Sequence, residues 1–215
     1  MRRLKLILII VLSTVLVITI AGGIFVLTLN VKSKRIGNVD IEVKNDQDGE
    51  IEIGKEYTAL TYNIGFGAYD RDYSFFMDEG VMNDGTKTKG KYGKAVSKEN
   101  VLKNTNGSIE ILKSVNADFM MLEEVDTKST RSYKVNQYEM ITSTFNNYSI
   151  SYASNFHSGY LPYPLNDMHG TVNSGLLTMS RFNVKESKRI ELPVETKFPT
   201  KFFDLDRCLN LIRYK

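Results

Sequence analysis

The stretch ADFMMLEE, residues 117–124, decides the fold of this chain. Its first six residues are almost wholly apolar, as in an interior strand that is covered on both faces. Two carboxylates, Glu123 and Glu124, follow directly. The pattern therefore predicts a buried strand that carries a pair of acidic side chains at its end.

An earlier β-rich run, residues 57–62, ends at Asn63, and Gly65 then breaks the strand. Between the two predicted strands, Ser97 is placed to cap a helix that runs to about Val115. Apolar residues fall near one face of this helix and charged residues fall on the other. The sequence thus predicts a strand, a helix and a second strand, with polar side chains where each strand ends.

A long segment, residues 69–97, precedes the helix and is glycine-bearing, charged and aromatic by turns. It contains the turn signal NDG at residues 83–85. We expect a long loop in which residues 75–77 (FFM) form a small apolar plug. Loops of this length in compact domains are usually functional or mobile.

Two further motifs follow. Residues 173–182 indicate an interior strand and a polar turn, and residues 203–213 alternate into a strand with Arg207 at its start. A guanidinium can hold phosphate oxygens through two parallel hydrogen bonds. The alternative is a structural ion pair between Arg207 and Asp204 or Asp206.

The N-terminus is apolar over residues 6–29, a run of 24 residues without a charge. At about 1.5 Å per residue this run covers roughly 36 Å, more than the roughly 30 Å of a bilayer core. We expect residues 1–30 to be an uncleaved single-pass anchor in the cell membrane, with the domain outside. A cleaved signal peptide is the alternative, because basic residues precede the run and AGG at 21–23 offers small residues.

Residues 31–55 are rich in charge and carry the turn signal NDQDG at 45–49. The stretches on either side, 39–43 and 50–53, alternate with period two, as strands with one wet face do. We expect a juxtamembrane stalk or hairpin here. Residues 56–215 then form the domain proper.

Composition sets limits on the class of protein. The chain has 215 residues, a formal net charge of +3 and one cysteine, Cys208. This length has room for one domain of modest size, and the small net charge makes no case for a dedicated nucleic-acid binder. A single cysteine excludes an intramolecular disulfide framework and a cysteine-rich zinc site. No obligate protein partner is implied.

The motifs TYNI (61–64), MLEEVD (121–126), SGLLTMSRF (174–182) and DLDR (204–207) occur in one order. Together they resemble the first half of the endonuclease/exonuclease/phosphatase family, which is built like pancreatic deoxyribonuclease. The resemblance implies an α/β fold, a four-layer sandwich of two mixed β-sheets flanked by helices. It covers about half of a family domain, so we expect an incomplete fold that exposes the inner face of its sheet.

The resemblance also implies a catalytic site. Its asparagine and metal-binding glutamate correspond to Asn63 and Glu124, which makes Mg²⁺ or Mn²⁺ the expected cofactor. Glu123 stands where the family usually has glutamine, so Glu123 and Asn63 are further candidate ligands. Arg207 is the candidate for the substrate phosphate, with Asn173 as a weaker one. The alternative to a catalytic site is a purely structural one, in which Asn63 caps a strand and the two glutamates form a solvated turn.

Histidine is the usual general acid or base near neutral pH, and the sequence has His157 and His169. The family's catalytic histidine belongs to a later Ser-Asp-His motif that this sequence does not contain. We therefore expect His157 to be a surface loop residue. His169 could line the cleft and contact the substrate phosphate.

The expected function is a membrane-anchored, metal-dependent phosphodiesterase or phosphatase. The substrate is a phosphate ester whose class stays open among nucleic acid, phospholipid and nucleotide. We expect residues 1–215 alone to be a truncated and inactive fragment, because the family's aspartate and histidine motifs are not in this sequence. The alternative is a noncatalytic anchored module that uses the same fold for binding.

Overall fold

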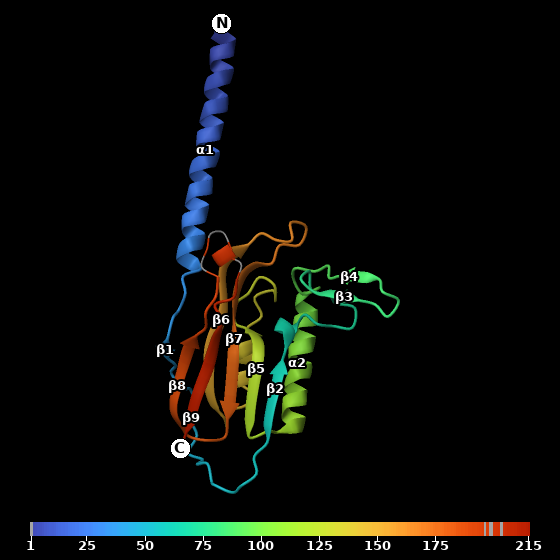
Figure 1. Cartoon of the computed structure of the whole chain (residues 1–215), viewed down its shortest axis with the longest axis vertical. Helices are drawn as coiled ribbons and strands as arrows, with labels where there is room; N and C mark the ends of the chain where they lie inside the picture. Colours follow the sequence, from blue (N-terminus) through green and yellow to red (C-terminus); the bar gives the residue numbers. More distant parts are fainter. Residues whose placement is uncertain (1, 196, 198–199, 203) are drawn as a thin grey trace.

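A computed structural model describes residues 2–195, 197, 200–202 and 204–215. It shows one long N-terminal helix followed by a mixed α/β domain with several sheets (Figure 1). The N-terminal helix points away from the domain, so the apolar N-terminus and the predicted strands form separate parts of the molecule.

The central sheet has four strands in the order β2-β5-β7-β6. Their bounds are Ala59–Asn63 for β2, Phe119–Asp126 for β5, Gly170–Ser180 for β7 and Ser149–Leu161 for β6. β2 and β5 are parallel, and Asn63 lies opposite Glu123 in their register. The parallel pairing confirms both predicted strands and brings their C-terminal ends to the same edge of the sheet.

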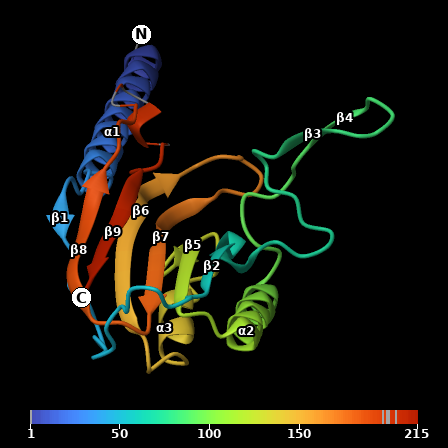
Figure 2. The ribbon, with the colours of Figure 1, turned by 60° about the horizontal axis from the view of Figure 1, so that its bottom comes forward.

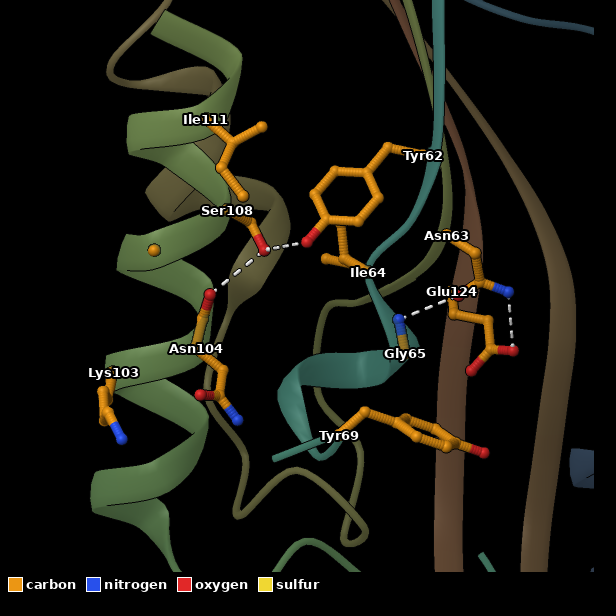
Figure 3. Close-up of a pocket in the computed structure, with 11 residues that line it drawn as sticks. Tyr62, Asn63, Ile64, Gly65, Tyr69, Lys103, Asn104, Ser108, Ile111 and Glu124 are labelled. Atoms are coloured by element: carbon orange, nitrogen blue, oxygen red, sulfur yellow. Dashed lines mark hydrogen bonds between the residues drawn. The ribbon is translucent and has the colours of Figure 1, made fainter. Parts of the chain in front are cut away.

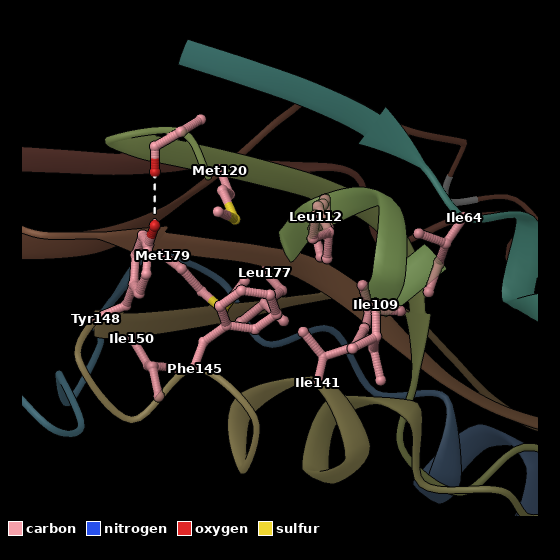
Figure 4. Packing of buried hydrophobic residues seen from close by; sticks show 13 residues of the cluster. Ile64, Ile109, Leu112, Met120, Ile141, Phe145, Tyr148, Ile150, Leu177 and Met179 are labelled. Atoms are coloured by element: carbon pink, nitrogen blue, oxygen red, sulfur yellow. Dashed lines mark hydrogen bonds between the residues drawn. The ribbon is translucent and has the colours of Figure 1, made fainter. Parts of the chain in front are cut away.

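Helices cover one face of this sheet. α2 (Lys98–Val115) begins after Ser97, whose hydroxyl oxygen accepts a hydrogen bond from the Asn100 backbone N–H at 3.2 Å. This confirms the predicted helix and its cap. The short helix α3 (Gln137–Thr142) lies on the same side. Between helices and sheet lies the main core, which includes Ile109, Leu112, Met120, Leu122, Ile141, Leu177 and Met179 (Figure 4).

A second sheet packs on the opposite face of β6 and β7. It has the order β1-β8-β9, with bounds Val39–Asp40, Val184–Glu191 and Cys208–Tyr214. Hydroxyl groups of Ser151 and Ser187 bond at 2.7 Å, and the Asn210 amide donates to Thr178 Oγ1 at 3.2 Å. The two sheets therefore meet through buried polar side chains at this point.

The second sheet does not extend over β2 and the adjoining part of β5. Met121, on the face of β5 turned away from the helices, is 40% exposed, and Ala59, Thr61 and Glu123 are exposed beside it. The uncovered area of the central sheet therefore combines apolar and polar side chains.

Residues 31–55 were expected to form a stalk or a hairpin, and they pair with strands of the domain instead of with each other. β1 pairs with β8, Lys44 bridges to Ile150, and Gly49 bridges to Phe182. The period-two pattern shows that one face of a strand is wet but does not identify the strand beside it. Here the pairing partners belong to the second half of the chain.

The long loop before α2 contains a small hairpin of β3 (Glu79–Val81) and β4 (Lys87–Lys89). Its turn is at the predicted NDG signal, where the Met82 backbone N–H donates to the Thr86 carbonyl at 2.8 Å. Figure 2 shows this hairpin projecting from the domain. Two short 3₁₀ helices, η1 (Gly65–Gly67) and η2 (Thr200–Phe202), complete the elements.

The N-terminal helix α1 (Arg2–Lys32) is long and apolar enough to be a membrane span or a signal sequence. Its buried residue, Leu29, packs beside Gly159 of β6, where an added Cβ would collide with Leu29 and Lys32. The Gly159 backbone N–H donates to the Ser33 hydroxyl at 3.2 Å, and Lys201 of η2 donates to Asn30 Oδ1 at 2.7 Å. These contacts hold the base of α1 against β6 and η2.

Candidate active site

The predicted site residues Asn63 and Glu124 lie in contact where β2 and β5 end (Figure 3). The Asn63 amide nitrogen donates to Glu124 Oε1 at 3.0 Å, and Asn63 Oδ1 accepts from the Gly65 backbone N–H at 2.8 Å. Asn63 therefore uses both ends of its amide group, one to close the turn after β2 and the other to orient the glutamate.

A β-bulge sets the direction of the two glutamates. Leu122 pairs with Leu177 and Val125 pairs with Gly175, so Glu123 and Glu124 together face one residue of β7. Glu124 has a φ of +56°, a left-handed conformation that is uncommon for a side chain of this kind. Bulges of this type redirect side chains and are frequent beside active sites. Pairing with β7 then resumes at Val125, and the strand ends at Asp126, four residues after the apolar run ends.

Glu124 lies at the boundary of two cavities. The smaller, of about 700 Å³, lies between β2 and α2 and is shown in Figure 3. The larger, of about 1040 Å³, we name the aromatic cavity. Asn63, Glu123, Glu124, His169 and Arg207 all line the aromatic cavity, so the fold brings five of the six predicted residues to one place. Its other lining residues include Phe66, Tyr69, Phe75, Phe76, Asp78, Arg131, Asn155, Phe156, Leu161, Tyr163, Ser174, Asp204 and Leu205.

Arg207 is exposed in this cavity and makes no side-chain hydrogen bond or ion pair within the described part of the chain. Asp206 instead pairs with Arg189, whose Nη2 lies 2.9 Å from its carboxylate. Asp204 accepts from the Leu205 backbone N–H at 2.8 Å. The structural alternative for Arg207, a pair with one of these aspartates, is therefore not formed.

His169 lines the cavity from a buried position. Its Nδ1 bonds to the Gly93 carbonyl, and its ring contacts Phe66, Phe75, Phe76 and Phe156. Burial, reinforced by the nearby Arg131 guanidinium, lowers the pKa of His169 from 6.5 to about 4. At neutral pH His169 is therefore uncharged, and it offers no cationic contact to a phosphate.

Two of the residues considered from sequence lie elsewhere. Asn173 is exposed, and its amide donates to the Lys128 carbonyl at 3.3 Å, while the adjacent Ser174 lines the cavity instead. His157 was expected in a surface loop, but it belongs to β6, and its Nε2 bonds to the Lys34 carbonyl at 2.6 Å. Alternation along β6 and β7 decides which face each of these residues occupies.

Sequence reasoning missed the buried ion pair behind the site. Asp126 is fully buried and accepts from Arg131 Nε at 3.1 Å, Arg131 Nη2 at 2.9 Å and the Ser132 hydroxyl at 2.8 Å. Arg131 also donates to Ser174 Oγ at 3.1 Å and lies 4.0 Å from the centre of the Phe66 ring. The only sign of this ion pair in the sequence was Asp126, two residues after Glu124.

Among the predicted metal ligands, Glu124 has a carboxylate oxygen that is open to an ion. The residues that the structure describes contain no group of three or more His, Cys, Asp or Glu side chains that could hold a metal ion. Mg²⁺ commonly keeps several waters and takes one or two carboxylates together with substrate phosphate. Glu124 has one carboxylate oxygen bonded to Asn63, while its Oε2 has no hydrogen bond within the described residues. Glu123 is the nearest second carboxylate in sequence, and Asn63 serves to orient Glu124.

Comparison with models of protein families, with curated proteins and with solved structures finds no match to this chain.

Proposed function

We propose that the aromatic cavity binds a divalent cation and a phosphate ester, as the metal-binding and phosphate-binding site of a membrane-attached phosphoric ester hydrolase. One observation carries this proposal: the Asn63–Glu124 pair, at the ends of two parallel strands, lines the same cavity as the unpaired Arg207. A carboxylate for the metal and a guanidinium for the phosphate are the two charges that such a complex needs.

Each residue has a distinct part in this proposal. Glu124 would hold Mg²⁺ or Mn²⁺, and Asn63 would keep its carboxylate oriented through the 3.0 Å hydrogen bond. When bound, the metal would polarise the phosphoryl oxygen and stabilise the leaving group. Arg207 would neutralise the phosphate, and Glu123 would add negative charge beside the metal. Arg131 is already bonded to Asp126 and supports the cavity wall.

The fold supports the proposed relation to the endonuclease/exonuclease/phosphatase family. Helices cover one face of the central sheet and a second sheet packs on the other. Three of the family-like motifs lie on β2, β5 and β7, and the fourth directly precedes β9. We propose that this arrangement is part of the deoxyribonuclease-like sandwich. We expect the aromatic cavity to bind the metal and the ester together.

Binding of a phosphodiester in the presence of Mn²⁺ tests this function. The full chain in detergent is titrated with bis(p-nitrophenyl) phosphate, and the same titration is run with Arg207→Ala. Loss of a charged hydrogen-bond partner should weaken ester binding about tenfold or more and leave Mn²⁺ binding unchanged.

The matched control is Arg213→Ala. Arg213 is an exposed arginine on β9, the strand that directly follows Arg207. It pairs with Glu186 and does not line the cavity. Equal losses in the two variants would show a nonspecific charge effect and contradict the proposal. Ester binding with the same affinity in the presence and absence of Mn²⁺ would favour a noncatalytic binding module.

A further inference from the structure

The candidate site opens at the end of the domain from which α1 emerges. β2 and β5 run toward that end, and Figure 1 shows α1, η2 and the loop between β6 and β7 grouped there. Along β6, Gly159 packs against Leu29 of α1, and Leu161, two residues later, lines the aromatic cavity. A bilayer that surrounds α1 would therefore lie close to the cavity.

Apolar side chains project into solvent around this end of the domain. Tyr163, Leu165 and Met168 lie on the loop between β6 and β7, and Leu165 is 76% exposed. Val81 and Met82 lie on the β3–β4 hairpin and are also exposed. We name these five residues the apolar rim. Exposed apolar side chains at the end of a domain that carries an anchor helix are typical of segments that enter the membrane interface.

Basic side chains lie at the base of α1 and on the β3–β4 hairpin. Lys32 and Lys34 follow the uncharged run of α1, Lys201 reaches Asn30 from η2, and Lys87 and Lys89 lie on β4. Lysines close to a membrane surface are attracted to anionic lipid headgroups. The combination of apolar and basic side chains at this end thus suits an anionic bilayer more than bulk water.

The wall of the cavity is also more suited to a lipid than to a small polar ester. Phe76, Phe156, Leu161, Tyr163 and Leu205 line it together with Arg207 and Glu124. Tyr163 belongs to both the apolar rim and the cavity wall. Tyr163 therefore connects the apolar rim with the wall of the cavity that holds the charged groups.

We propose that the apolar rim lies in the bilayer surface and that the ester bound in the aromatic cavity is a phospholipid of the same membrane. Its phosphate would meet Arg207 and the metal held by Glu124, and the start of its acyl chains would contact the apolar wall. This inference rests on the proposed function for the phosphate site, whereas contact between the rim and the membrane can be measured without metal or ester.

The first arm of the test measures that contact. Leu165→Cys and, separately, Met82→Cys are labelled with a polarity-sensitive fluorophore in the full chain, in vesicles of phosphatidylcholine and phosphatidylglycerol that contain a spin-labelled lipid. Ile53→Cys is the matched control, because Ile53 is fully exposed and lies near Ile51, which bonds to Lys215 at the other end of the domain. The native Cys208 is buried, so the unsubstituted chain sets the labelling background.

Lipid contact predicts several-fold stronger quenching at positions 165 and 82 than at position 53. Equal, weak quenching at all three positions would overturn the membrane-facing rim. The quenching does not depend on metal or phosphate. It therefore tests membrane contact of the apolar rim separately from the proposed function.

The second arm identifies the ester. The same vesicles, with Mg²⁺, carry a phosphatidylglycerol analogue with a photoreactive diazirine near the start of one acyl chain, and a diazirine oligonucleotide is added in a parallel sample. We expect the lipid probe to label the peptides that contain Leu161 or Leu205, and we expect labelling to fall several-fold in Arg207→Ala but not in Arg213→Ala. Labelling of these peptides by the oligonucleotide, or lipid labelling confined to α1, would overturn the phospholipid assignment.

Discussion

Glu124 and Asp126 lie two residues apart on β5 and have opposite surroundings. Asp126 is fully buried and accepts three hydrogen bonds from Arg131 and Ser132. Glu124 is partly exposed at the cavity and has one bond, from Asn63. A carboxylate with a full set of buried donors stabilises the fold, whereas one with a free oxygen at a cavity is available to a metal. The bulge at residues 123–124 creates this difference.

The largest effect is expected at the buried carboxylate. Asp126→Ala should lower the free energy of unfolding by about 3–5 kcal/mol, because it leaves the Arg131 charge buried and unpaired. Denaturant unfolding of the full chain in detergent measures this. The double variant with Arg131→Met should recover part of the loss. If Asp126→Ala costs no more than about 0.5 kcal/mol, as surface changes do, the contrast with Glu124 is wrong.

The next effect concerns pH and His169. Its pKa is about 4 in the folded chain against 6.5 ordinarily, because burial and Arg131 disfavour the charged ring. As the pH falls from 6.5 to 4, the unfolded chain takes up a proton that the folded chain does not. The free energy of unfolding should therefore decrease by up to about 3 kcal/mol as the pH falls from 6.5 to 4.

The control for this prediction is His169→Phe, which keeps an aromatic ring among the phenylalanines and removes the titrating group. Its free energy of unfolding at pH 7 should drop, since the Gly93 carbonyl loses its partner. Its dependence on pH between 6.5 and 4 should be clearly shallower than that of the unsubstituted chain. An unchanged slope would mean that another group controls acid stability.

A smaller effect is expected where one side chain orients another. Asn63→Ala removes the amide that holds Glu124 Oε1, and loss of such a partner typically weakens metal binding about 10–100-fold. Mn²⁺ affinity, followed by electron paramagnetic resonance, measures it. Asn155→Ala is the control, because Asn155 lines the same cavity without bonding to Glu124. Equal affinities in the two variants would contradict the orienting role of Asn63.

The smallest effect is expected at Glu123. Its side chain is exposed at the edge of the sheet, so Glu123→Gln should change the free energy of unfolding by no more than about 0.5 kcal/mol. We expect Mn²⁺ affinity to decrease less than tenfold, because the variant keeps an oxygen at this position and removes only its charge. A greater loss, measured in the same titration, would indicate that Glu123 is the main ligand.

Local patterns in the sequence predicted the elements that carry the site. The apolar run before Glu123 became β5, the Ser97 cap marks the start of α2, and the β-rich run before Asn63 became β2. Such signals depend on residues close together in the chain, so they can be seen without the tertiary structure. The meeting of Asn63 and Glu124 followed once both strands ended at the same edge.

Features that depend on distant residues could not be predicted. The bulge at Glu123–Glu124 exists only in the pairing with β7, about 50 residues later in the chain. Likewise, residues 39–40 pair with β8, about 150 positions later, although their alternation suited a local hairpin equally well. In each case the local pattern is compatible with several partners, and packing selects one.

The most direct test of the proposed metal site is Mn²⁺ binding by Glu124→Gln beside Glu123→Gln and Asp126→Asn. The full chain is titrated in detergent, and circular dichroism reports whether each variant is folded. If Glu124 is the ligand, Glu124→Gln should remain folded and lose measurable Mn²⁺ binding, whereas Glu123→Gln should keep it and Asp126→Asn should lose stability. Near-normal Mn²⁺ affinity in folded Glu124→Gln would contradict the proposed site.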